Sequence, residues 1–200
     1  MKKYLLAAAA LLGLFACKNR EVKTMENPLE GPVVVMETTA GTMKIRLYNA
    51  TPRHRDNFMK LAREGYYDGL RFHRVIAGFM VQGGDPFSRD TTKRQLWGTG
   101  GPDYTVPAEF VTELKHCKGA IAAARKGDMA NPRRASSGSQ FYIVQSEAGC
   151  SHLDGAYTVY GQVIEGLEVV DAIAAVATDP YDRPLGDMMI LKVYPEPQAE

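Results

Sequence analysis

The sequence lacks an excess of charge of either sign: 24 Lys and Arg residues balance 23 Asp and Glu residues, a formal net charge of +1 at pH 7. It also has no long run of basic residues, whereas binding to a phosphate backbone usually needs a basic stripe. Repeats and low-complexity tracts are absent. These absences predict one globular domain with an extension and no nucleic-acid partner.

Patterns typical of a metal or cofactor site are missing too. The four histidines have no metal-ligand spacing. The glycine-rich segment Gly98–Gly101 lacks the Lys and Ser/Thr of a phosphate-binding loop and is typical of turns. Ser136, Ser137 and Ser139 do not form a nucleophile-elbow pattern. We therefore expect no metal and no cofactor.

The N-terminal residues are typical of an export signal. An apolar run from Tyr4 to Ala16 follows two lysines, and it is too short for a helix that spans a bilayer. Ala16 and Cys17 resemble the site at which bacterial lipoprotein signals are cut before a lipidated Cys. This predicts a signal peptide over residues 1–16, then a lipidated Cys17 and polar tether over residues 17–31. The alternative is a signal peptide cut elsewhere, with Cys17 incidental.

Such processing predicts a location in the bacterial cell envelope, with the protein exported and lipid-anchored to a membrane, facing the periplasm or the surface. Two cysteines follow the tether, Cys117 and Cys150. An oxidising compartment permits a disulfide between them, but only if their Cα atoms lie within about 7 Å. A disulfide and two unpaired thiols both stay open at this point.

Hydrophobic periodicity predicts a mainly β chain. Residues 33–38 and 43–48 flank a turn, as in a β-hairpin. Further strands are expected at residues 69–75, 79–82, 119–125, 140–145, 158–163 and 189–193. One helix begins with Thr51 as N-cap and Pro52 at its first position, and a second covers residues 166–175. This pattern of about eight short strands predicts a closed or nearly closed antiparallel barrel within a domain over residues 32–196, followed by a tail over residues 197–200.

One contiguous segment closely resembles the signature of the cyclophilin family: Phe72-His73-Arg74-Val75-Ile76-Ala77-Gly78-Phe79-Met80-Val81-Gln82-Gly83-Gly84-Asp85. Further matches follow in order at Gly98–Pro102, Gly138–Ile143, Leu153–Gly155 and Tyr160–Val163. The resemblance extends from about Val33 to about Pro195. It implies an eight-stranded antiparallel closed barrel capped by a helix at each end, with a proline-binding groove on its outer surface.

The resemblance also implies roles for individual residues. Arg74 matches the catalytic arginine of the family, and we expect Gln82 to orient its guanidinium or to bind substrate backbone. The other groove residues expected from the resemblance are Phe79, Met80, Gln140, Tyr142, His152, Leu153 and Tyr157. Among these, Tyr142 stands where Phe is common, and His152 and Tyr157 stand where well-known members have Trp and His.

Two assignments of groove residues need a further argument, that of His73 and that of the Ala-Asn pair of the family. His73 precedes Arg74 and is counted among the substrate-binding residues, although strand alternation points it to the opposite face and favours a structural role. The Ala-Asn pair of the family falls either on Ala124-Arg125 or on Ala130-Asn131. We favour Ala124-Arg125, because the apolar pattern sets the strand register and the extra residues then lie in a loop.

Rotation about an X-Pro bond faces a barrier of about 18–20 kcal/mol. A guanidinium aimed at the prolyl nitrogen bonds the twisted amide better than the planar one, and this lowers the barrier without a cofactor. The resemblance thus predicts a peptidyl-prolyl cis–trans isomerase acting on proline-containing polypeptides among exported proteins. Two alternatives stay open: a proline-segment binding module or chaperone with little turnover, and a lipoprotein whose barrel scaffolds envelope partners.

Overall fold

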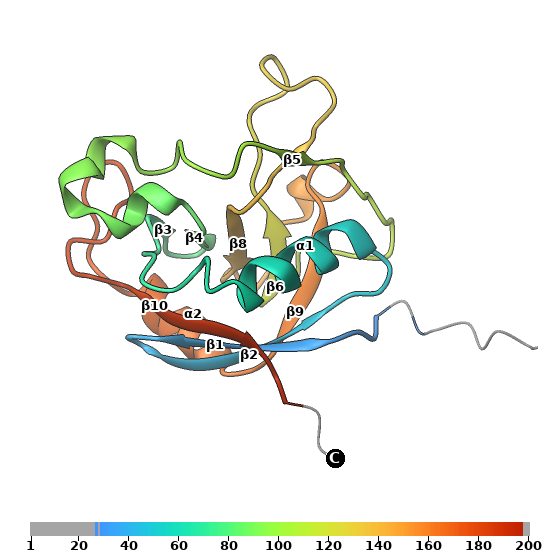
Figure 1. The fold of residues 1–200 in the computed structure, drawn as a ribbon, viewed down its shortest axis with the longest axis horizontal. Coiled ribbons are helices and arrows are strands. Elements are labelled where there is room, and N and C mark those ends of the chain that lie inside the picture. The colour runs from blue at the N-terminus through green and yellow to red at the C-terminus, as the bar shows by residue number, and fades with distance from the viewer. Residues whose placement is uncertain (1–26, 28, 198–200) are drawn as a thin grey trace, which may run out of the picture.

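The computed structural model describes residue 27 and residues 29–197, so the predicted signal peptide and Cys17 lie outside the described residues. Eight strands form one antiparallel sheet, which curls around the core (Figure 1). In order across the sheet they are β10 (Ile190–Pro195), β1 (Val33–Thr38), β2 (Gly41–Leu47), β9 (Val159–Glu165), β6 (Ala120–Ala123), β8 (Phe141–Val144), β4 (Met80–Gly83) and β3 (Arg74–Ile76).

The predicted closure of the barrel is wrong: the sheet is open, with β10 and β3 as its edges. The segment that precedes β3 meets the start of β10 through an isolated bridge between Arg71 and Met189 and a few backbone hydrogen bonds around it, not through a ladder between β3 and β10. The loop between α2 and β10 occupies the free edge of β3, where the Val75 N–H donates to the Asp182 carbonyl at 2.7 Å. Because this loop supplies the backbone partner, β3 does not pair with β10.

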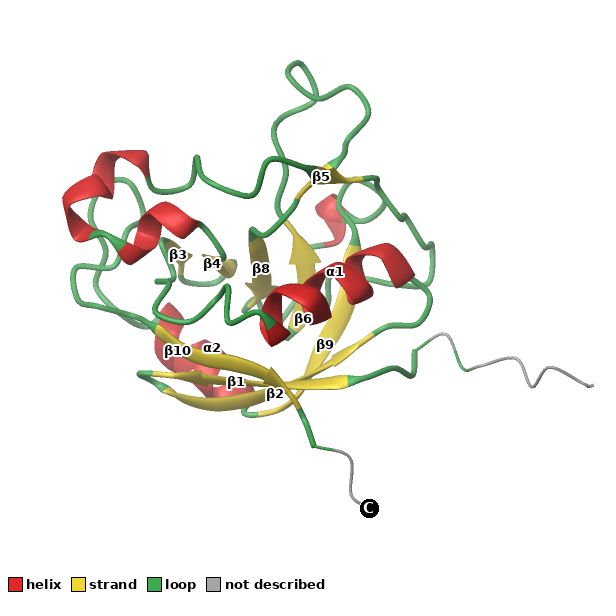
Figure 2. Ribbon diagram, viewed as in Figure 1, coloured by secondary structure: helices red, strands yellow, loops and turns green. Residues whose placement is uncertain are grey.

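The two helices that the sequence predicted are present, and they pack against the inside of the curled sheet. They are α1 (Pro52–Arg63) and α2 (Leu167–Ala174), shown in red in Figure 2. Phe58 of α1 and Val170 and Ile173 of α2 are buried in one hydrophobic core together with the inward residues of the strands. In α1 the buried apolar residues recur three and four positions apart, which is the spacing of one helix face.

A distant carboxylate caps the start of α1. Thr51 is the N-cap residue, but its hydroxyl makes no cap bond and is buried without a partner. Instead, Glu109 accepts hydrogen bonds from the backbone N–H groups of Arg53 at 3.1 Å and His54 at 3.0 Å. The same carboxylate lies 2.6 Å from His54 Nδ1. Glu109 therefore satisfies helix N–H groups that otherwise have no intrahelical acceptor.

The connections contain short elements that hydrophobic periodicity did not predict. Strands β5 (Thr105–Val106) and β7 (Ser136–Ser137) form a second small sheet, and three 3₁₀-helices are η1 (Pro86–Arg89), η2 (Thr91–Leu96) and η3 (Ser151–Leu153). Cys117 and Cys150 are both free thiols. Within residues 27 and 29–197, no helix is long and apolar enough to cross a membrane.

Replacing Glu109 by Ala should destabilise the fold by about 1–3 kcal/mol, because it leaves partly buried donors of α1 without an acceptor. Burial acts to raise the pKa of Glu109, but hydrogen bonds from His54 and the two backbone N–H groups outweigh it and hold this pKa below the ordinary 4.5. The stabilisation is therefore complete at neutral pH and is lost as pH falls through the lowered pKa.

Urea unfolding at several pH values measures this difference between wild type and Glu109→Ala. Glu113→Ala, at an exposed position of the same loop, is the matched control and should change stability little. Equal stability of the wild type and Glu109→Ala at neutral pH would contradict the capping role.

Candidate functional site

Four neighbouring strands align polar and aromatic side chains in a row across the outer face of the sheet. Arg74 on β3 pairs with Gln82 on β4, Gln82 pairs with Tyr142 on β8, and Tyr142 pairs with Ala122 on β6. Directly paired residues present their side chains on the same face. The adjacent row faces inward and is buried in the core: Val75, Val81, Ile143 and Ile121.

An open groove of about 390 Å³ lies over the outer row. It is lined by all the residues predicted to be catalytic or substrate-binding except Gln140 and His152, namely His73, Arg74, Phe79, Met80, Gln82, Ala124, Arg125, Tyr142, Leu153 and Tyr157. The structure therefore brings these residues together, although they come from positions far apart in the chain.

Gln140 lies behind the groove and supports it. Its side-chain oxygen accepts from Gln82 Nε2 at 3.1 Å, and its own Nε2 donates to the carbonyls of Gly98 at 3.1 Å and Gly100 at 2.7 Å. The fully buried Asp85 accepts from the N–H groups of the same two glycines. A Cβ at Gly100 would lie 2.3 Å from the Asp85 carboxylate, so this close approach requires glycine.

Asp182 is the ionic partner of Arg74. Its carboxylate Oδ2 lies 3.3 Å from Arg74 Nε. In the part of the chain that the structure describes, Gln82 makes no hydrogen bond to Arg74. The structure therefore shows no direct hydrogen bond through which Gln82 would orient the Arg74 guanidinium, a role that we expected from the sequence. Arg74 remains partly exposed in the groove, with 44% of its side chain accessible.

The apolar side of the groove is formed by a second hydrophobic cluster, on the outer face of the sheet. Met80 and Tyr142 are its buried members in the groove, and Phe79, Leu153 and Tyr157 pack against it. His152 stacks on Phe79, with ring centroids 5.9 Å apart, and lies beside the groove rather than in its lining. This cluster therefore provides an apolar surface in the same groove as the Arg74 guanidinium.

A hydrogen-bonded chain fixes Tyr142. Its hydroxyl lies 3.0 Å from His116 Nε2, and His116 Nδ1 lies 2.7 Å from Asp154 Oδ1. Burial lowers the pKa of His116, which outweighs the opposite effect of Asp154 and keeps the imidazole neutral at neutral pH. Since the carboxylate only accepts, Nδ1 carries the proton and Tyr142 donates to Nε2.

His73 is buried and lines the groove beside Gly98, so it is not turned away from the groove as strand alternation predicted. Strand β3 begins only at Arg74, and the pleat therefore does not constrain His73. Burial, with help from Arg74 and Arg183, lowers its pKa to about 4 against the opposite effect of Asp85. Neither ring nitrogen has a hydrogen-bond partner among the described residues.

The competing segments of the predicted Ala-Asn pair lie in different places. Ala124 and Arg125 line the groove, whereas Ala130 and Asn131 belong to an exposed loop. The Arg125 guanidinium stacks on Tyr157 at 4.4 Å and donates to the Ala156 carbonyl and to Asp128. The positive charge of Arg125 is therefore paired with a carboxylate of the protein itself.

Sequence reasoning missed four residues that line the groove: Trp97, Gly98, Tyr181 and Arg183. Trp97 follows η2, and its ring lies 5.1 Å from the Arg94 guanidinium. Tyr181 and Arg183 lie in the loop that precedes β10. No periodic pattern marks these positions, because long-range contacts between loops place them in the groove.

A second polar cluster has distances like those of a nucleophilic triad. His54 lies 2.9 Å from Ser136 Oγ and 2.6 Å from Glu109. Ser136 is only 1% exposed, so a substrate has no access and the cluster is structural. The described residues contain no group of three or more acidic, His or Cys side chains that could hold a metal ion.

Comparison with known proteins identifies the relatives of this fold. The model of the family described as cyclophilin type peptidyl-prolyl cis-trans isomerase/CLD matches residues 33–194. The chain is 37% identical over 162 residues to the peptidyl-prolyl cis-trans isomerase CYP18-1 of Arabidopsis thaliana, covering 80% of this chain and 93% of that protein. It is 38% identical over 165 residues to peptidyl-prolyl cis-trans isomerase-like 1 of Mus musculus, covering 82% and 92%.

A solved structure is also similar. The crystal structure of a cyclophilin type peptidyl-prolyl cis-trans isomerase of Cryptosporidium parvum matches with a TM-score of 0.73 and 29% identity, covering 84% of this chain and 99% of that chain.

Replacing Tyr142 by Phe should keep the aromatic wall of the groove but leave His116 Nε2 buried without its donor. We expect a loss of stability of about 1–2 kcal/mol, measured by urea unfolding. The matched control is Tyr157→Phe, because the Tyr157 hydroxyl makes no hydrogen bond among the described residues while its ring also lines the groove. Equal stability of the two variants would show that the Tyr142–His116 bond contributes nothing.

Proposed function

The chain belongs to the cyclophilin-type peptidyl-prolyl cis–trans isomerase family, and from this premise we propose that it accelerates X-Pro rotation through Arg74 in the groove described above. The single observation that supports this proposal is the cross-strand row that sets Arg74 and Gln82 beside the aromatic wall of Tyr142. That row combines a fixed cation with an apolar surface for a proline ring.

Arg74 acts on the substrate amide as it twists. In the twisted state the prolyl nitrogen becomes pyramidal and regains a lone pair, which a guanidinium N–H bonds better than the planar amide. The apolar surface of Phe79, Met80 and Leu153 holds the proline ring while the other side of the bond rotates. A thousandfold acceleration requires only about 4 kcal/mol, which a charged donor in a partly desolvated groove supplies.

Backbone groups of the groove bind the peptide on either side of the proline. Ala124 is held by hydrogen bonds with Gln140 and Ser137, whereas the Arg125 backbone N–H and carbonyl make none among the described residues. An extended peptide pairs with such free groups as it would with a sheet edge. The solved structure of the Cryptosporidium parvum relative in the presence of the dipeptide Ala-Pro supports a proline-containing substrate here.

We further propose that this activity lies in the bacterial cell envelope. An apolar run that ends in Leu14-Phe15-Ala16-Cys17 supports cleavage before Cys17 and lipidation of its thiol. Residues 17–31 then connect the lipid to the domain, whose first strand begins at Val33. The clients in this proposal are exported polypeptides that fold near that membrane.

Arg74→Ala should lower kcat/KM by at least about tenfold in a coupled proteolysis assay on a proline peptide, with little change in melting temperature, because a half-exposed ion pair contributes little stability. Arg74→Lys should also be slow, since an ammonium lacks the planar fork of donors. Arg63→Ala, at the exposed end of α1, is the matched control and should keep wild-type turnover.

Wild-type kcat/KM in Arg74→Ala would overturn the mechanism. A wild-type domain that binds proline peptides without accelerating their isomerisation would favour a binding module.

Intact-mass analysis of the protein isolated from its native membrane should show a chain that starts at Cys17 and carries added acyl mass. Acyl chains anchor it, because each buried methylene contributes about 0.8 kcal/mol. Cys17→Ser should move the protein to the soluble fraction or leave it unprocessed, whereas Cys117→Ser should stay at the membrane. An unmodified mature N-terminus at another residue would refute lipidation.

A further inference from the structure

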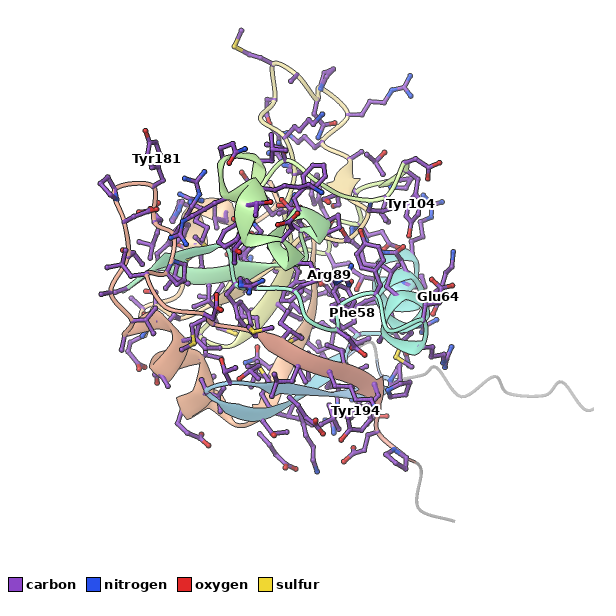
Figure 3. All side chains as sticks on the ribbon, turned by 60° about the vertical axis from the view of Figure 1, so that its left-hand side comes forward. Phe58, Glu64, Arg89, Tyr104, Tyr181 and Tyr194 are labelled. Carbon is purple, nitrogen blue, oxygen red and sulfur yellow. The ribbon has the colours of Figure 1, made fainter. Side chains whose placement is uncertain are left out.

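The loop of residues 177–187, which connects α2 to β10, forms one side of the groove. Tyr181 and Arg183 line the groove from this loop. Figure 3 shows Tyr181 at the outer end of the loop, pointing away from the body of the molecule. Its side chain is 73% exposed, and the Arg183 guanidinium lies 5.0 Å from its ring. Between these two residues stands Asp182, the ionic partner of Arg74.

The loop has a fixed shape because Asp179 organises it. The Asp179 carboxylate accepts from the backbone N–H of Tyr181 at 2.8 Å and of Arg183 at 3.0 Å. The Asp179 carbonyl accepts from the Asp182 N–H at 3.0 Å, and the Asp179 N–H donates to the Arg183 carbonyl at 2.8 Å. Four hydrogen bonds thus close a turn whose tip carries Asp182.

Two residues outside the loop, Arg94 and Val75, fix this turn against the rest of the molecule. Arg94, at the end of η2, donates to the Pro184 carbonyl at 2.8 Å and to the Asp179 carboxylate at 3.4 Å. On the other side, the Val75 N–H of β3 donates to the Asp182 carbonyl at 2.7 Å. Asp182 is therefore held next to β3, where its backbone partner Val75 directly follows Arg74.

The Asp182 backbone adopts a conformation that costs free energy for residues other than glycine, although Asp and Asn enter it more often than most. Its φ is +62°, in the left-handed region that side chains other than glycine rarely occupy. Its ion pair with Arg74 is 41% exposed on the Asp182 side and 44% on the Arg74 side, so it contributes little stability. The backbone of Asp182 holds the loop on β3, but its carboxylate adds little stability, so its contact with Arg74 favours a functional role for this side chain.

We propose that Asp182 is a positioning residue for the isomerase reaction. Its carboxylate holds the Nε–H of Arg74, so that the two Nη groups of Arg74 face the groove. This inference rests on the proposed function of Arg74. Among the described residues, no protein acceptor binds the Nη groups of Arg74, which leaves them to the substrate. A guanidinium already held by one edge loses less freedom when it binds the twisted amide.

The same carboxylate sets the charge of the groove rim. Arg125 is paired with Asp128 and Arg74 with Asp182, whereas Arg183 has no carboxylate partner among the described residues. Removing the Asp182 charge therefore shifts the rim toward positive potential. Substrates with an acidic residue beside the proline then gain relative to basic ones.

The test uses Asp182→Asn and Asp182→Gly, because Asn and Gly both tolerate a positive φ and keep the loop in shape. We expect kcat to fall by about three- to tenfold with KM within about twofold, the mark of an interaction made in the transition state. Asp182→Gly should match or exceed wild-type stability. Leu185→Ala, an exposed position of the same loop, is the control and should leave kcat unchanged.

Two readouts separate positioning from a general loop defect. Asp182→Asn should favour Ala-Glu-Pro-Phe over Ala-Lys-Pro-Phe more than wild type does, and added salt should remove the difference. In ¹⁵N-labelled protein, the Arg74 Nε–H should exchange with water faster in Asp182→Gly than in wild type, because glycine has no side-chain acceptor. A defect of folding lowers turnover of both peptides equally.

Wild-type kcat in Asp182→Gly, or unchanged exchange of the Arg74 Nε–H in that variant, would overturn this inference. It fails alone if Arg74→Ala is slow while Asp182→Gly is not. If Arg74→Ala keeps wild-type turnover, the proposed function of Arg74 fails instead, and the two failures are therefore distinguishable.

Discussion

The groove depends on one constraint, the alternation of side chains across β3, β4, β8 and β6. The register that buries Val75, Val81 and Ile143 in the core also sets Arg74 and Gln82 on the opposite face. A slip of one residue would move the apolar row to solvent and the arginine to the core. Core packing and groove chemistry are therefore specified by the same pairing, and the stability of the core maintains the geometry of the site.

Behind this row, buried or half-buried carboxylates arrange the groove from segments that are distant in sequence. Asp85 holds the turn of Gly98 and Gly100, Asp154 acts through His116 on Tyr142, and Asp182 contacts Arg74. Each lies in a connection rather than in a strand. The strands supply the positions of the groove residues, and the connections limit the rotation of their side chains.

Hydrophobic periodicity and the family resemblance together predicted the strands of the eight-stranded sheet, both helices and most of the groove lining, because alternation and a contiguous signature are local properties. They did not predict the open sheet edge, the cap that Glu109 provides, or Trp97, Tyr181 and Arg183 in the groove. These features depend on hydrogen bonds between loops far apart in the chain, which leave no periodic trace. His73 shows the limit of alternation, since a residue just outside a strand does not follow its pleat.

The titratable groups of the groove suit a reaction without proton transfer. Burial, with help from Arg74 and Arg183, holds the pKa of His73 near 4, and burial raises that of Tyr142 well above its ordinary value, so neither changes charge near neutral pH. Rotation about an amide bond needs no proton to move, only a donor that meets the prolyl nitrogen as it pyramidalises. In the proposed mechanism, a peptide lying over Phe79 and Met80 excludes water from the Arg74 guanidinium, and this strengthens the hydrogen bond to the prolyl nitrogen as the amide twists. An open groove is therefore compatible with electrostatic catalysis, because the substrate itself supplies the desolvation.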